Sequence, residues 1–291
     1  MKDRIQGSTR LFAIFGHPLT YTLSPAFQNA GLAALGLDAA YVPMPVPPAG
    51  FAAAFCGFQA LESSLGANIT NPHKQAVLPL LDRISPEARA IGAVNTVWRQ
   101  GRRWAGGNTD WSGFLAAASA MGEKPLAGRR AFLLGAGGAA RGLAYACLKG
   151  SARQVLVLAR RPAQARQLAL ALDPQARRVK AAPLDLALLD SAQAGDWLIN
   201  TIPDPGFSRR CGLALAGKPR LRVFDIVYQP LLTPLLASAK KGGHQALGGL
   251  GMLLEQGAQA LEIWSGKEAP RQAMARALQA ALRQRKDLTK H

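Results

Sequence analysis

Three polar segments in the first half of the chain carry side chains that could act on a small molecule. Residues 66–74 (GANITNPHK) end a short apolar run in a polar turn that carries a lysine. Residues 92–96 contribute a side-chain amide, and residues 107–110 contribute a carboxylate where a helix should begin. An ammonium group and a carboxylate near an amide can orient a polar ligand and move a proton. Taken singly, Lys74 would be an ordinary surface lysine and Asp110 a helix N-cap.

A glycine-rich turn in the second half of the chain could bind phosphate groups. Residues 133–141 (LLGAGGAAR) join an apolar run to a helical pattern. Glycine permits positive φ and lets the backbone approach a pyrophosphate, and the free N–H groups of a helix N-terminus attract its charge. The spacing varies from the strict fingerprint and can also serve tight packing, but the flanking strands and helix favour cofactor binding. The candidate cofactor-binding residues are Gly135, Ala136, Gly137, Gly138 and Ala139.

The end of the next predicted strand indicates which dinucleotide would bind. An Asp or Glu there would accept hydrogen bonds from a ribose 2′-hydroxyl and repel a 2′-phosphate. This strand instead ends Leu158-Ala159-Arg160-Arg161, and paired guanidinium groups match a phosphate in geometry and charge. The alternative is a solvated surface pair, although no carboxylate lies nearby in the sequence. Arg160 and Arg161 therefore favour NADP over NAD.

The elements that must position these residues follow an α/β pattern. Short apolar runs alternate with helical periodicity, which predicts largely parallel sheets. The predicted strands are residues 11–15, 40–44, 66–69, 94–98, 130–134, 154–158, 197–199 and 222–224. The predicted helices are residues 25–35, 50–61, 86–91, 139–148, 162–172, 251–264 and 270–283. We expect two domains that divide within a helix starting near Asp110, with the last helices free to pack back onto the first domain.

The composition limits the possible functions. The chain has 291 residues, enough for two domains, and a formal net charge of +18. This charge favours anionic partners, but the arginines are scattered, and only the group at 99–103 is flanked by aromatics, Trp98 and Trp104, too few for the stacking platform of a nucleic-acid binder. The 3 cysteines match no disulfide framework or zinc pattern, and no metal is implied. The N-terminus has no apolar signal sequence and no run is long enough to cross a bilayer, so we expect a cytoplasmic protein.

These motifs together resemble the shikimate dehydrogenase family over most of the chain, from near Phe12 to near Trp264. The matching segments of the first half are residues 16–18 (GHP), 22–25 (TLSP), 68–74 (NITNPHK), 92–96 (GAVNT) and 108–110 (NTD). Those of the second half are residues 135–141 (GAGGAAR), 225–228 (DIVY), 233–235 (TPL) and 249–256 (GLGMLLEQ). The resemblance implies a substrate domain of residues 1–111 completed by helices within 250–291, and a Rossmann-like NADP-binding domain of residues 112–249.

The resemblance also implies an activity and residue roles. NADP would serve the interconversion of 3-dehydroshikimate and shikimate, with Lys74 and Asp110 as the catalytic pair. The substrate-binding residues implied are Thr22, Ser24, Asn68, Thr70, Asn95, Tyr228 and Gln256. The residues expected near the nicotinamide are Gly249 and Met252. The partners expected are small molecules, without nucleic acid or membrane, and the protein is expected to be a monomer or homodimer.

Several positions depart from the family pattern. Thr22 replaces the usual serine, Gln28 stands where the family has histidine, and residues 159–161 and 200–203 differ from the cofactor-side loops. His73 lies beside the predicted catalytic lysine, where we expect it to fill space. The alternatives are a quinate/shikimate or aminoshikimate dehydrogenase of the same family, and a non-catalytic sensor of a related metabolite on the same fold.

Overall fold

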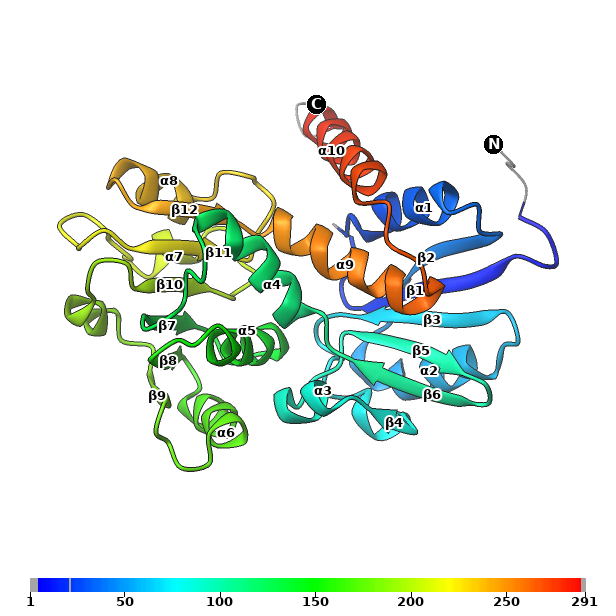
Figure 1. Ribbon diagram of the computed structural model, residues 1–291, viewed down its shortest axis with the longest axis horizontal. Helices are drawn as coiled ribbons and strands as arrows, with labels where there is room; N and C mark the ends of the chain where they lie inside the picture. Colours follow the sequence, from blue (N-terminus) through cyan, green and yellow to red (C-terminus); the bar gives the residue numbers. More distant parts are fainter. Residues whose placement is uncertain (1–4, 21, 289–291) are drawn as a thin grey trace. The chain divides into compact units, whose positions relative to one another are not determined.

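The chain forms two compact units. The computed structural model describes residues 5–20 and 22–288, so residues 1–4, 21 and 289–291 of the predicted domains lie outside the described part. One unit consists of Met1–Thr109 and Leu254–His291, and the other of Asp110–Leu253. Figure 1 colours both along the chain. The first unit is therefore built from two separate segments, and the C-terminal helices belong to it.

The first unit is built on a mixed sheet. Its described residues form six strands in the order β2-β1-β3-β5-β6-β4. β1 lies parallel to both β2 and β3, whereas β5 runs antiparallel to β3 and β6. The strands are β1 Arg10–Gly16, β2 Ala39–Pro45, β3 Ser64–Ile69, β4 Arg83–Ile84, β5 Thr96–Gln100 and β6 Arg103–Gly107.

The hairpin of β5 and β6 is the main departure from the sequence-based expectation of largely parallel strands. β6 has the sequence RWAGG, and its two glycines have no side chains to show an alternating pattern. Gly106 nevertheless has no room for a Cβ, which would lie 2.4 Å from Leu81 Cδ1. The turn between the strands contains Gly101 with φ +62, a left-handed conformation that glycine adopts without strain.

Alternating side chains of β1 pack against helices on opposite faces of this sheet. On one face Phe15 contacts Phe51, Phe55 and Phe58 at ring-centroid distances of 5.3 to 6.1 Å. On the other face Phe12 stacks on Trp264 at 4.9 Å. This period of two is what a strand buried on both sides requires. The helices are α1 Ser24–Ala34, α2 Phe51–Ala60, α3 Pro86–Ile91, α9 Leu250–Ser265, whose first residues belong to the second unit, and α10 Arg271–Leu288.

The returning C-terminal helices pack closely on α1. Gly31 of α1 lies against Leu261 of α9 and Met274 of α10, and both of these side chains are buried. Gln28, which stands where the family has histidine, is fully buried, and its Nε2 donates to Gly257 O at 2.9 Å. The side chain of Gln28 thus links α1 to α9 through this hydrogen bond.

The second unit has an all-parallel sheet. Within the described chain it contains six strands in the order β12-β11-β10-β7-β8-β9. Counted from β7 this is the order 3-2-1-4-5-6 of a Rossmann fold, whose ligand site lies where the strand order reverses. The strands are β7 Arg130–Leu134, β8 Gln154–Ala159, β9 Val179–Pro183, β10 Trp197–Asn200, β11 Arg222–Asp225 and β12 Gln245–Gly248.

Helices cover the second sheet, and its core is apolar. Phe114 of α4 packs edge-on against Trp197 and Phe224 at centroid distances of 5.9 and 4.9 Å.

The edge strands β9 and β12 and the helix α8 were not expected from the sequence, because each is short and β9 and β12 are only partly buried. The helices are α4 Asp110–Ala118, α5 Gly138–Lys149, α6 Pro162–Leu172, α7 Phe207–Arg210 and α8 Pro234–Lys241.

The close approach of α9 to α1 predicts a different cost for alanine at two glycines of the same helix. A Cβ at Gly257 would lie 2.4 Å from Cε2 of Phe27, a fully buried ring, so Gly257→Ala should lower the free energy of unfolding by roughly 1–3 kcal/mol through overpacking. A Cβ at Gly251 meets only Ala117 Cβ at 3.6 Å, so Gly251→Ala should cause no loss. Urea denaturation of both variants measures this, and equal stabilities would contradict it.

Candidate functional site

The glycine-rich turn follows β7 and leads into α5. Gly135 has φ +108, and a Cβ there would lie 2.6 Å from Thr201 Oγ1, so the turn requires glycine at this position. Its N–H donates to Leu158 O of the neighbouring strand at 2.8 Å. Gly137 precedes α5, and a Cβ there would meet no atom within 4 Å.

The start of α5 suits an anion. No side chain caps its first turn, and no acidic residue lies in that turn. Its N–H groups and the positive end of its dipole are therefore suited to phosphate oxygens. The backbone is open at Gly137, and β7 lies between β8 and β10, where the strand order reverses. The turn thus fits the pyrophosphate of a dinucleotide.

The two predicted phosphate-binding arginines follow the strand next to this turn. β8 pairs with β7 in parallel, from Arg130↔Gln154 to Leu134↔Leu158, so Arg160 and Arg161 follow β8 at the sheet edge where the glycine-rich turn follows β7. Both are exposed, and α6 begins directly after them at Pro162. Exposed guanidinium groups at this position fit a 2′-phosphate on the adenosine ribose.

A network of buried amides lies at the carboxyl end of β3 in the first unit. Asn68 Nδ2 donates to Asn95 O at 3.3 Å and to Thr96 Oγ1 at 3.2 Å. Asn68 Oδ1 accepts from the hydroxyl of Tyr41 at 2.8 Å. Asn68 is 6% exposed, so its amide is held almost entirely by protein groups.

Asn95 extends this network to α9. Its Nδ2 donates to Thr109 Oγ1 at 3.0 Å and to Gln256 Oε1 at 3.3 Å, while its Oδ1 accepts from Thr109 N at 2.7 Å. Thr109 Oγ1 in turn donates to Gln256 O at 2.9 Å. The structure therefore brings together Asn68, Asn95 and Gln256, three of the residues predicted to bind substrate. Tyr41 and Thr109 were missed, because a tyrosine within an apolar strand and a threonine between two candidates carry no distinct sequence signal.

The turn that carries Lys74 is held by its backbone and by His73. Lys74 O accepts from Val94 N at 2.8 Å, and Thr70 N donates to Phe15 O at 2.8 Å. His73 is 1% exposed, its ring stacks on Phe51 at 4.1 Å, and its Nε2 lies 2.7 Å from Val46 O. His73 thus packs in the interior, and the Lys74 side chain stays partly exposed.

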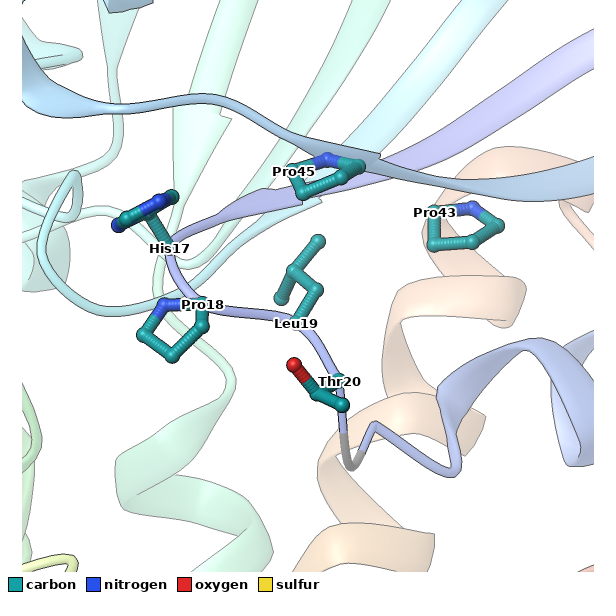
Figure 2. A pocket seen from close by; sticks show the side chains of 6 residues that line it. All are labelled: His17, Pro18, Leu19, Thr20, Pro43 and Pro45. Atoms are coloured by element: carbon teal, nitrogen blue, oxygen red, sulfur yellow. The ribbon is translucent and has the colours of Figure 1, made fainter.

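The predicted carboxylate-binding hydroxyls lie at the start of α1. Thr22 Oγ1 accepts from Ser24 N at 3.3 Å, and Ser24 is 5% exposed. Figure 2 shows a concave surface formed by the residues that follow β1 and by two prolines of β2. It is lined by His17, Pro18, Leu19, Thr20, Pro43 and Pro45. None of the predicted site residues lines this mainly apolar hollow.

Two predicted residues of the second unit follow the carboxyl ends of its strands. Tyr228 lies three residues after β11 and is half-buried. Gly249 follows β12, and a Cβ there would lie 2.1 Å from Ile226 O, so the two loops approach as closely as backbones allow. Met252 is 4% exposed and packs in the core of this unit. Its predicted place near the nicotinamide stays a prediction.

Asp225 organises the loop that carries Tyr228. Its carboxylate accepts from Asn200 Nδ2 at 2.9 Å, from Thr233 Oγ1 at 2.6 Å and from Val227 N at 3.2 Å. Burial raises the pKa of Asp225, and these hydrogen bonds oppose the rise. The network connects the ends of β10 and β11 with the start of α8.

The predicted catalytic pair is divided between the units. Lys74 belongs to the first unit, and Asp110 begins α4 as the first residue of the second. Asp110 is 4% exposed and directly follows Thr109, which is fixed by Asn95. The pairing of Lys74 with Asp110 stays a prediction.

The described residues contain no group of three His, Cys, Asp or Glu side chains placed to hold a metal ion. Over the same part of the chain, no helix is both long enough and apolar enough to span a bilayer. The cysteines Cys56, Cys147 and Cys211 are free.

The parallel sheet, its reversed strand order and the glycine-rich turn define a two-domain α/β protein with a Rossmann-type nucleotide-binding domain. Residues 14–97 match the family model for the shikimate dehydrogenase substrate binding domain, and residues 249–279 match that for the shikimate 5'-dehydrogenase C-terminal domain. The chain is 44% identical over 285 residues to the shikimate dehydrogenase (NADP(+)) of Geobacter metallireducens, covering 96% of this chain and 99% of the relative. The chain belongs to the shikimate dehydrogenase family, which confirms the resemblance seen in its motifs.

Solved structures agree with this assignment. The Thermus thermophilus shikimate 5-dehydrogenase in complex with NADP(H) and shikimate has a TM-score of 0.78 at 34% identity, covering 94% of this chain and 100% of that one. The 5-ketofructose reductase of a Gluconobacter species, in its ligand-free form, has a TM-score of 0.75 at 33% identity, covering 94% and 99%. The fold is therefore shared by enzymes named for different substrates.

The raised pKa of Asp225 predicts how stability depends on pH. The folded state binds its proton more tightly than the unfolded chain, so this group's contribution to stability falls as pH rises from about 4, the unfolded pKa, through the higher folded pKa. Asp225→Asn keeps the shape without the titration, since its amide can accept from Asn200 and donate to Thr233. Denaturation at several pH values should show the variant gaining stability relative to the parent as pH rises above about 4. A constant difference would contradict the prediction.

Proposed function

We propose that this protein interconverts 3-dehydroshikimate and shikimate with NADP(H). The observation that carries the proposal is the buried network of Asn68, Asn95 and Gln256, in which residues from two distant segments of the chain meet in one unit. The Lys74 turn is joined to the same region through Val94, which is next to Asn95. Such a set of amides, joined to the turn that carries a lysine, suits a small ring that carries several hydroxyl groups.

The cofactor would be held by the second unit. The backbone of Gly135, Ala136, Gly137, Gly138 and Ala139 would bind the pyrophosphate, and Arg160 and Arg161 the 2′-phosphate. Gly249 and Met252 would lie by the nicotinamide. When bound, NADPH supplies the hydride that reduces the ring ketone.

The chain's own residues would supply the proton and the orientation. Lys74 Nζ, as an ammonium, stabilises the oxygen on which negative charge develops and donates the proton to it. Asp110 keeps that ammonium charged and oriented. Thr22 and Ser24 hold the ring carboxylate as neutral donors, while Asn68, Thr70, Asn95, Tyr228 and Gln256 orient the ring hydroxyls and complete the pocket.

The threonine at position 22 is a reason to test a second candidate function, in which the enzyme acts on a substrate other than shikimate. Its side chain carries a methyl group that the family serine lacks, and its Oγ1 already accepts from Ser24 N. The extra methyl could favour quinate or another cyclic polyol, and the fold's likeness to a 5-ketofructose reductase shows that substrates vary on this scaffold. An assay with shikimate and quinate, each with NADP and NAD, decides between them. Rapid NADP reduction with shikimate alone supports the proposal, and turnover only with quinate would overturn it.

We also propose a cytoplasmic protein that binds small molecules. The 3 cysteines are all free, and free thiols suit a reducing compartment. We expect a monomer or a homodimer, and sedimentation measurements distinguish the two.

Replacement of Lys74 tests the proton donor. Lys74→Ala should lower kcat by at least roughly two orders of magnitude, the usual cost of losing a general acid. NADPH binding, measured by the fluorescence of the cofactor, should be unchanged because the turn that binds it lies in the other unit. Turnover close to that of the parent would show that Lys74 is not the donor.

Replacement of the arginine pair tests the cofactor. In the double variant Arg160→Ser/Arg161→Ser the KM for NADP should rise roughly tenfold or more, because two charge-assisted contacts to a phosphate are lost. The KM for NAD should change by less than about twofold, since NAD lacks that phosphate. Arg153→Ser, which removes an exposed arginine at the opposite end of β8, serves as the control. An unchanged ratio of the two KM values would exclude the arginines from cofactor selection.

A further inference from the structure

Tyr41 is a buried tyrosine fixed at both its backbone and its ring. It lies in β2 and is 2% exposed. Asn29 of α1 accepts from Tyr41 N at 2.8 Å and donates to Tyr41 O at 2.9 Å. Its ring lies 6.0 Å from that of Trp264, which is itself tied to Val97 O. Because every part of the residue is held, the position of its hydroxyl is set by the fold.

The hydroxyl of Tyr41 must be the donor in its hydrogen bond with Asn68. Asn95 O can only accept, so the atom of Asn68 that faces it must be the amide nitrogen. The oxygen of that amide then faces Tyr41, whose hydroxyl donates to it at 2.8 Å. A phenol has a single proton, and this bond uses it.

The phenol of Tyr41 stays protonated. Burial raises the pKa of Tyr41 well above its usual value, so the phenol keeps its proton over the working pH range. The Tyr41 hydroxyl of β2 is therefore a fixed hydrogen-bond donor to Asn68 of β3.

We propose that Tyr41 is a positioning residue for substrate binding, which holds the Asn68 amide in its orientation. The inference rests on the proposed function, in which Asn68 contacts the substrate. It assigns no contact of Tyr41 itself with substrate or cofactor. Without the phenol hydroxyl, the Asn68 oxygen loses its buried donor.

Tyr41→Phe tests this role, because it keeps the ring and its packing and removes only the hydroxyl. The KM for shikimate should rise roughly 5- to 10-fold, as expected for disturbing one or two hydrogen bonds. The KM for NADP and kcat should stay within about twofold, since the turn that binds the cofactor and Lys74 are untouched. Ser64→Ala is the matched control, because it removes a buried hydroxyl of the same unit that bonds to Phe58 O and Leu61 O. It should affect stability only.

Asn68→Ala and the double variant Tyr41→Phe/Asn68→Ala separate this inference from the proposed function. If Tyr41 acts mainly through Asn68, the double variant should have a KM for shikimate within about twofold of that of Asn68→Ala. A raised KM in Asn68→Ala with an unchanged KM in Tyr41→Phe would overturn the role of Tyr41 and leave the proposed site in place. An unchanged KM in Asn68→Ala would overturn Asn68 as a substrate contact, and the inference with it.

Discussion

The amide of Asn95 joins the two segments of the first unit within the candidate site. The chain leaves this unit after Thr109 and returns to it at Leu254, so contacts between the segments are needed to form the unit. Asn95 bonds to both sides of this gap, through Thr109 on one segment and Gln256 on the other. Because the side chain is 2% exposed, each bond left unmade would cost the desolvation of a buried polar group. The hydrogen bonds of the candidate site thus also contribute to joining the two segments.

The second unit depends on close approaches of its backbone. Gly135 and Gly249 each lie where a Cβ would collide with a neighbouring loop. At these contacts the segments after β7 and β12 lie against the segments that follow β10 and β11. Asp225, at the end of β11, accepts hydrogen bonds there from Asn200 and Thr233. Short loops held in this way leave the start of α5 accessible to phosphate while the sheet below is fully packed.

The two units divide the chemistry in a physically reasonable way. In the proposed function, the first would provide directed hydrogen bonds from amides and hydroxyls, which distinguish a polar ring by the positions of its substituents. The second would provide backbone N–H groups and exposed arginines, which suit phosphate through their charge. Each set of groups is built around its own sheet, so either can vary without rebuilding the other. The same scaffold can therefore serve enzymes named for different substrates.

The sequence alone was sufficient for the family, the α/β class with a Rossmann-like second half and the candidate motifs, because these depend on local patterns. The strands β7 and β8 and the helix α6 were predicted closely, since β-branched or aliphatic runs and a proline at the helix start mark them. The β5–β6 hairpin was not predicted. Its second strand is rich in glycine, and its place in the sheet depends on the side chains that pack against Gly106.

Only the tertiary structure revealed which polar groups share a network. Tyr41 and Asn68 are 27 residues apart and Asn95 and Gln256 are 161 apart, and no spacing along the chain encodes such contacts. The direction of each hydrogen bond depends on which neighbour can only accept, as Asn95 O does for Asn68. Local residue types thus determined the chemistry available to this protein, and long-range packing decided which side chains are held in place to perform it, because buried donors and acceptors must find partners wherever the fold brings them.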